Sequence, residues 1–323
     1  MRSLKLGIFL PIFESPDDSL FPGLLRWPEL LALVRRIEAA GFDSVWVPDH
    51  LLIRWDGERG PAAGAWEGWS LLAALAAATE HVELGTLVLC TAFRNPALLA
   101  KMADTVDEIS NGRLILGLGA GDHEPDFRAF GYPFDYRVSR FAEALTIITR
   151  LLRDGAIDFD GTYYSARACE LRPRAARPGG PPIMVGGGFP PGPRMVRLGV
   201  EHADIWNHWL AFDRSYPDAL PPLRQQVDAV CATIGRDPTM LRRTVTVAVV
   251  PPGHQPAHTA PHVESVTGSA EEIGGVFRDF ARVGGDHLQL LLNPCNEAAV
   301  DALLPVLNLL DQGASADRHA SGE

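Results

Sequence analysis

The chain has 323 residues, of which 46% are hydrophobic and 21% charged, and its formal net charge is −11. This composition is ordinary for a globular protein, and a chain of this length can bury roughly three quarters of its unfolded surface. The acidic balance and the lack of a basic run in the sequence disfavour a nucleic-acid partner, which needs clustered Lys and Arg.

Short apolar segments alternate with longer helical patterns along the chain, which predicts repeated βα units and a parallel sheet. The predicted strands are 6–10, 43–47, 82–90, 113–120, 182–185, 203–207, 244–250 and 287–292. The predicted helices are 28–40, 69–79, 96–109, 139–152, 194–198, 223–234, 270–283 and 297–310. Eight βα units are the number that a closed (β/α)8 TIM barrel of the α/β class requires.

Three segments do not fit the repeat and are predicted to be insertions: 51–66 after the second strand, 154–180 before the fifth and 251–263 after the seventh. Long loops in compact domains are usually functional or disordered. We expect a single barrel domain over 1–311, and a disordered tail over 312–323, where apolar periodicity is lacking.

Four cysteines lie far apart and form no CxxC pair, which disfavours a zinc site and a disulfide framework; they are Cys90, Cys169, Cys231 and Cys295. The histidine spacing also gives no support for a metal site. The sequence has neither a signal-peptide pattern nor an apolar run of about 20 residues. We therefore expect a cytoplasmic protein without metal or membrane contact.

The second predicted strand ends in Asp49 and His50. In a strand–helix barrel the loops at the strand ends converge on one mouth, where the chemistry takes place. A histidine with a near-neutral pKa can exchange a proton, and an adjacent carboxylate can fix its tautomer or hold a hydroxyl. The alternative is a capping aspartate beside a surface histidine. The position at a strand end favours a functional pair.

Glycines alternate along the fourth predicted strand at Gly117, Gly119 and Gly121, so they share one side of it. They either leave room for a flat ring against the sheet or allow tight packing within the barrel. Asp122 follows where the strand ends. The spacing resembles a dinucleotide fingerprint, but no helix begins there, so a Rossmann interpretation is disfavoured.

A run of three glycines follows the fifth predicted strand. Such a run lets backbone N–H groups face a phosphate without obstruction, whereas a tight turn needs only one or two positive-φ residues. The run therefore favours an anion site, formed by Gly186, Gly187 and Gly188. By contrast, the apolar segment 87–91 is typical of plain core when it is judged from its residues alone.

Taken together, the ordered segments 38–50, 84–89, 112–121, 126–133, 182–188 and 203–207 resemble the luciferase-like flavin and deazaflavin oxidoreductases. The resemblance covers 6 to about 208 and continues weakly over 266–292. It implies a TIM barrel that binds FMN or coenzyme F420, and a homodimer. In bacterial luciferases an arginine after the fourth strand grips the FMN phosphate, and the matching position here is Ala120. In F420-dependent glucose-6-phosphate dehydrogenases an Asp-His pair and a later acid match Asp49, His50 and Asp122, so F420 is favoured.

The resemblance also implies the roles of individual residues. The Leu87–Val88 bond matches a cis peptide that supports the ring, and Cys90 would lie near that ring. The expected cofactor-binding residues are Asp49, Leu87, Val88, Cys90, Gly119, Ala120, Gly186, Gly187 and Gly188. Three tryptophans would line the substrate pocket or belong to the core, namely Trp55, Trp66 and Trp69.

The function implied is hydride transfer between F420 and a small organic substrate. His50 would be the general acid or base, Asp122 a second proton carrier or an anchor for a substrate hydroxyl, and Asp49 would orient either His50 or the cofactor. One alternative is an FMN-dependent monooxygenase fed by a separate reductase. Another is a cofactor-binding or scaffolding relative without turnover, which the Asp49–His50 pair disfavours.

Overall fold

The computed structural model describes residues 2, 4–14, 23–54, 62–186, 191–257 and 263–321, with side chains described as far as residue 313. Its contacts divide the chain into two compact units. Unit 1 comprises Met1–Trp46, Asn207–Ala229 and Arg242–Glu323, and unit 2 comprises Val47–Trp206 and Val230–Leu241. The sequence alone suggested one domain over 1–311, with no such division.

Strands and helices alternate along the chain as the sequence predicts, and the fold is a (β/α)8 barrel. The third predicted strand is in two parts, and the Leu87–Val88 peptide bond between them is cis, as the resemblance implied. The strands at the eight barrel positions are β1 (Lys5–Phe9), β2 (Ser44–Val47), β5 (Glu83–Thr86) with β6 (Leu89–Cys90), β7 (Leu114–Gly119), β10 (Ile183–Gly186), β11 (Ile205–Trp209), β12 (Arg242–Val249) and β13 (His287–Leu292).

Side-chain caps mark the start of several helices. At the start of α3, the Asn95 side chain accepts hydrogen bonds from the amides of Ala97 and Leu98, and Pro96 takes the first position, where no N–H is needed. Ser269 and Glu272 form a capping box at the start of α8. The helices are α1 (Trp27–Ala39), α2 (Gly68–Ala78), α3 (Pro96–Ile109), α4 (Glu124–Phe130), α5 (Arg137–Asp154), α6 (Pro193–His202), α7 (Leu220–Ile234), α8 (Ala270–Arg282), α9 (Glu297–Ala302) and α10 (Leu304–Ser321).

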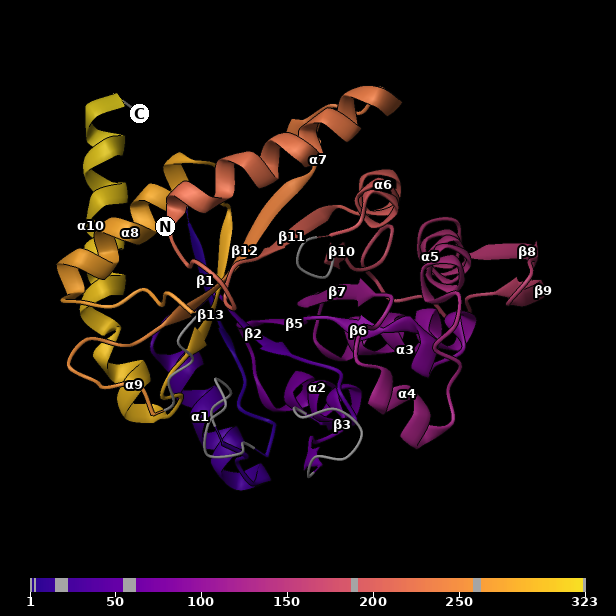
Figure 1. Cartoon of the computed structure of the whole chain (residues 1–323), viewed down its shortest axis with the longest axis horizontal. Coiled ribbons are helices and arrows are strands. Elements are labelled where there is room, and N and C mark those ends of the chain that lie inside the picture. Colours follow the sequence, from indigo (N-terminus) through magenta and orange to yellow (C-terminus); the bar gives the residue numbers. More distant parts are fainter. Residues whose placement is uncertain are drawn as a thin grey trace. The chain divides into compact units, whose positions relative to one another are not determined.

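In unit 1 the parallel strands follow the order β12–β13–β1–β2. Leu288 of β13 lies opposite both Val245 of β12 and Leu6 of β1, and Ile8 lies opposite Val45 of β2. Helices α8 and α10 pack side by side in this unit (Figure 1). The fully buried aromatic side chains here are those of Phe9, Phe13, Trp46, Phe277 and Phe280.

In unit 2 the parallel order is β10–β7–β5, with β6 also paired to β7. Val185 of β10 lies opposite Leu118 of β7, and Cys90 of β6 lies opposite Gly119. The carboxyl ends of β6, β7 and β10 therefore meet at one edge. This edge is where a barrel of this kind carries its chemistry.

The predicted insertions contain structure of their own. A short antiparallel pair, β3 (Leu52–Ile53) with β4 (Ala63–Gly64), follows β2. A second antiparallel hairpin, β8 (Ala156–Asp160) with β9 (Ser165–Glu170), lies before β10 and extends beside α5 (Figure 1). The described part of the third insertion has no long element.

Helix α10 continues to Ser321 in the part of the chain that the structure describes. The disordered tail expected over 312–323 stays a prediction. Among the described residues, no helix is both long and apolar enough to cross a membrane.

Candidate functional site

The carboxyl edge of the unit 2 strands brings together most of the residues that the sequence singled out. The amide of Cys90, at the end of β6, donates a 2.9 Å hydrogen bond to Oδ2 of Asp49, just after β2. A Cβ placed on Gly119 would lie 3.9 Å from the carbonyl oxygen of Gly186, at the end of β10. Strand ends distant in sequence thus converge in one place.

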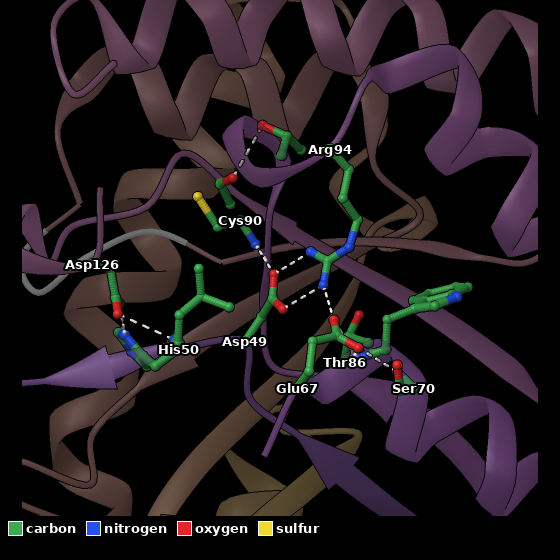
Figure 2. Close-up of polar contacts among 12 residues, drawn as sticks. Asp49, His50, Glu67, Ser70, Thr86, Cys90, Arg94 and Asp126 are labelled. Atoms are coloured by element: carbon green, nitrogen blue, oxygen red, sulfur yellow. Dashed lines mark hydrogen bonds and ion pairs between the residues drawn. The ribbon is translucent and has the colours of Figure 1, made fainter. Parts of the chain in front are cut away.

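Asp49 is held by an arginine. Its side chain is fully buried, and Arg94 donates hydrogen bonds from Nη1 to Oδ2 at 2.6 Å and from Nη2 to Oδ1 at 2.8 Å. The same guanidinium also pairs with Glu67, and Figure 2 shows Arg94 between the two carboxylates. Paired hydrogen bonds of this geometry fix both partners firmly. Asp49 is therefore committed to Arg94 and Cys90.

Glu67 connects this ion-pair network to a helix. Its carboxylate accepts hydrogen bonds from the amides of Trp69 and Ser70 and so caps the start of α2. Burial opposes ionisation, but the bonds from Ser70 and the charge of Arg94 lower the pKa of Glu67. For Asp49, burial raises the pKa, and the hydrogen bonds from Arg94 counteract part of that effect.

His50 forms a separate pair with a carboxylate from another element. Its Nδ1 lies 2.8 Å from Oδ2 of Asp126, the third residue of α4. The side chain of Asp126 is 2% exposed, whereas that of His50 is 33% exposed. In Figure 2 this pair lies to one side of the Arg94 network. A buried carboxylate thus orients a partly exposed imidazole.

Charges around His50 favour its protonated form. Burial alone would lower the pKa of His50, but its hydrogen bond to Asp126 and the negative charges of Asp126, Asp122 and Asp49 outweigh burial and raise the pKa. Asp122 is exposed and lies in the loop between β7 and α4. The predicted pair of His50 and Asp122 is therefore coupled electrostatically.

A second imidazole lies beside the first. The rings of His50 and His123 are 5.9 Å apart between centroids and nearly perpendicular. Nε2 of His123 accepts a 3.1 Å hydrogen bond from the amide of Arg54, and burial lowers the pKa of His123. His123 is therefore the neutral member of the two, and it binds the backbone of Arg54, the residue after β3.

Neighbouring atoms occupy the space beside each of the three alternating glycines, two in β7 and one after it. A Cβ on Gly117 would lie 1.9 Å from the carbonyl oxygen of Thr86, and one on Gly119 would lie 2.6 Å from Cγ2 of Val88. Gly121 has φ +75°, and a Cβ there would meet Phe127 and Cys90. At Gly117 the tight-packing alternative therefore holds. At Gly119 the missing side chain lets Val88 lie directly on β7.

Cys90 lies in an apolar cluster with Phe93 and Phe127. Burial raises the pKa of the Cys90 thiol to about 12. The thiol is therefore protonated at neutral pH and is not a nucleophile. Its contribution to the site is the backbone amide that binds Asp49, together with apolar surface.

The remaining expected site residues differ in exposure. Leu87 and Ala120 are buried, and Val88 and Gly186 are partly exposed. Trp69 is 6% exposed and packs in the core, as the alternative interpretation has it, whereas Trp66 is 36% exposed. Trp55, Gly187 and Gly188 lie outside the described residues. No group of three or more metal-ligating side chains occurs in the part of the chain that the structure describes.

Sequence reasoning missed two central residues, Arg94 and Asp126. Arg94 binds a carboxylate 45 positions away, and Asp126 binds an imidazole 76 positions away. Asp126 begins the segment 126–133 that carried part of the family resemblance. The sequence therefore marked this residue but did not indicate what it does. His123 was also missed, because nothing in its local sequence distinguishes it from a loop residue.

The fold and the site together define an α/β barrel protein with a carboxylate-oriented histidine at the strand ends. The chain belongs to the luciferase-like monooxygenase family, whose model matches residues 4–260.

Curated relatives are named for redox reactions, and several of their names state F420 dependence. The chain is 30% identical to a 5,10-methylenetetrahydromethanopterin reductase from Archaeoglobus fulgidus, a match over 66% of this chain and 57% of the relative. It is 35% identical to an F420-dependent glucose-6-phosphate dehydrogenase from Amycolatopsis mediterranei over 50% of this chain and 48% of the relative. The matches thus span about half the length of these relatives.

The fold is shared with solved structures over nearly the whole chain. One is an F420-dependent secondary alcohol dehydrogenase in complex with an F420-acetone adduct. It matches with a TM-score of 0.75 and 20% identity, over 96% of this chain and 99% of the other. This likeness establishes the barrel fold.

Proposed function

We propose that this protein transfers a hydride between coenzyme F420 and a small organic substrate. The observation that carries the proposal is the His50 imidazole, partly exposed at the strand edge and anchored by the buried Asp126. A positioned imidazole is the usual side chain for proton transfer near neutral pH. Relatives named as F420-dependent support the choice of cofactor.

The residues at the edge fit a deazaflavin. Val88 lies on the bare backbone of Gly119, and its side chain gives a small apolar surface. Gly186 ends the neighbouring strand β10, so its backbone lies beside that surface. The residue after β7 is Ala120, which is 8% exposed and offers no cation for an FMN phosphate. The apolar surface and the absence of a cation at this position support F420 in preference to FMN.

When bound, F420 supplies a ring carbon that accepts or releases a hydride. The protein supplies the matching proton. Because Nδ1 of His50 is committed to Asp126, a proton exchanged with the substrate passes through Nε2. In the reducing direction the imidazolium donates this proton to the substrate, and in the oxidising direction the neutral imidazole accepts it.

Two carboxylates assist in different ways. Asp122 is exposed near His50 and adds negative charge that favours the imidazolium. It is also placed to accept a hydrogen bond from a substrate hydroxyl. Asp49 acts indirectly, because Arg94 and the Cys90 amide use its oxygens and so fix the backbone that leads into His50. Trp66 remains a proposed wall of the substrate site.

Cofactor titration tests the proposal. Separate fluorescence titrations with F420 and FMN should give a Kd for F420 at least about tenfold lower, a difference of roughly 1.4 kcal/mol. The protein with F420 should then reduce the cofactor when given either a secondary alcohol or glucose 6-phosphate, the substrate classes of its relatives. Tighter binding of FMN would favour the monooxygenase alternative, and binding of neither cofactor would contradict both functions.

A further inference from the structure

Asp126 makes three hydrogen bonds with its two oxygens. Oδ1 accepts from the amides of Leu51 and Leu52 at 3.1 and 2.6 Å, and Oδ2 contacts Nδ1 of His50 at 2.8 Å. Its side chain is 2% exposed. A single buried carboxylate therefore holds both the imidazole and the two residues that follow it.

This geometry determines which nitrogen of His50 carries a proton. A carboxylate only accepts hydrogen bonds, so Nδ1 must be the donor in the pair. In the neutral imidazole one nitrogen donates and the other accepts, so a proton on Nδ1 makes Nε2 the basic atom. The amides at Leu51 and Leu52 prevent the carboxylate from turning away, because Oδ1 is already committed to them.

The other groups around His50 do not replace this role. Asp49 is bound by Arg94 and the amide of Cys90. Asp122 influences His50 through its charge. His123 contacts His50 edge to face and uses its own Nε2 to accept from the amide of Arg54. Of these groups, Asp126 makes the hydrogen bond that fixes the ring.

We propose that Asp126 is the positioning residue of the active site: it fixes the proton of His50 on Nδ1 and aims Nε2 at the substrate. This inference rests on the proposed function for its catalytic consequence, whereas the proton position itself can be measured on the protein with or without F420. It also links the orientation of His50 to the first residues of the insertion that follows β2.

The wild-type protein provides a first test. In protein labelled with ¹⁵N-histidine, long-range ¹H–¹⁵N spectra distinguish the two neutral tautomers, and a His50→Gln sample assigns the signal. Above its titration range, His50 should carry its proton on Nδ1, in free protein and in protein saturated with F420. A neutral His50 with its proton on Nε2 would overturn the proposal without any substitution at Asp126.

Asp126→Asn is the informative variant. In this variant the side-chain amide oxygen can still accept hydrogen bonds from the amides of Leu51 and Leu52. The side-chain NH2 group now faces His50, so Nδ1 of His50 must act as a hydrogen-bond acceptor. The His50 tautomer should switch to Nε2–H, and its titration should move to lower pH. Replacing a carboxylate that orients a catalytic imidazole by its amide costs about 10⁴-fold in turnover in a serine protease, so a fall in kcat of about 10²–10⁴-fold is expected here.

Glu124→Gln is the matched control. Glu124 lies in the same first turn of α4, but its side chain is 44% exposed and pairs with Arg128. This variant should retain the His50 tautomer and its titration range. An Asp126→Asn protein with the wild-type tautomer and titration would overturn the inference. If instead the tautomer switches but the wild-type protein fails to bind F420, the inference stands and the proposed function fails.

Discussion

His50 is the residue on which the proposed proton transfer depends. A positioned acid or base contributes about 10²–10⁴-fold to rate. His50→Ala should therefore lower kcat at least about 100-fold while the Kd for F420 changes less than about threefold, because the imidazole acts on the substrate proton. Stopped-flow absorbance of F420, with the substrate that turns over best, measures the first quantity, and fluorescence titration the second.

His81→Ala is the control for removing a histidine, since the side chain of His81 is 83% exposed. It should behave like the wild type in both measurements. A fall in kcat of no more than about twofold in His50→Ala would be far smaller than the fall expected on removal of a positioned proton carrier. That result would remove His50 from the mechanism.

At the scale of single residues, the sequence locates the site better than it assigns partners. Asp49 and His50 could be placed at a strand end because strand periodicity and the barrel topology predict that edge. The partners of both residues come from elsewhere: Arg94 follows β6 and Asp126 lies in α4. Side chains so far apart in sequence meet only through the folded backbone, which no local pattern encodes.

One helix is packed directly against the end of β2. A Cβ added to Gly68, the first residue of α2, would lie 2.2 Å from the carbonyl oxygen of Pro48 and 3.3 Å from Cγ1 of Val47. Gly68→Ala should therefore destabilise the protein by about 1–3 kcal/mol, a typical cost of overpacking. It should also lower turnover, because the displaced backbone leads into Asp49 and His50. Urea unfolding and the F420 assay measure the two effects.

Gly275→Ala is the matched control in α8, because a Cβ there has no atom within 4 Å among the described residues. Replacing a helical glycine with alanine at such a position stabilises a protein by roughly 0.4–1 kcal/mol. The free energy of unfolding should therefore fall in Gly68→Ala and rise in Gly275→Ala. Equal, small effects would show that α2 can move away from β2 at little cost.

At the scale of elements, prediction succeeded where caps and periodicity agree. The bounds of α3 and β13 match the predicted ranges, since Asn95 and Pro96 mark the start of α3 and apolar residues fill β13. Helix α4 was missed because seven residues show too little periodicity. The β8–β9 hairpin was missed because its outward positions are exposed and carry no core signal.

At the scale of the whole molecule, the alternation of strands and helices was sufficient to predict the barrel, because few other folds use eight βα units. The division into two compact units was not predictable, since three of its boundaries fall within β2, β11 and α7 and leave no mark in composition. Resistance to acid is a property at the same scale, and it depends on buried histidines of unit 1.

Two buried histidines in unit 1 make stability depend on pH. Burial lowers the pKa of His208 and of His287 to about 3 each, and nearby arginine and lysine charges add to the effect. Between pH 6.5 and about 3 the unfolded chain binds protons that the folded chain does not, so stability is present above pH 6.5 and is lost as pH falls. His50 opposes this trend, because its raised pKa favours the folded state in mild acid.

His287→Gln isolates one of these contributions. Glutamine can keep a hydrogen bond to Oγ of Ser44, which lies 2.8 Å from Nε2 of His287, but it does not titrate. Each buried histidine costs up to about 1.4 kcal/mol per pH unit below its unfolded pKa. The loss of stability between about pH 7 and about pH 5 should therefore be roughly 2 kcal/mol smaller in the variant than in the wild type. Urea unfolding of both proteins at each pH, with His81→Gln as the control, measures this difference, and equal losses would mean that His287 takes up a proton without unfolding.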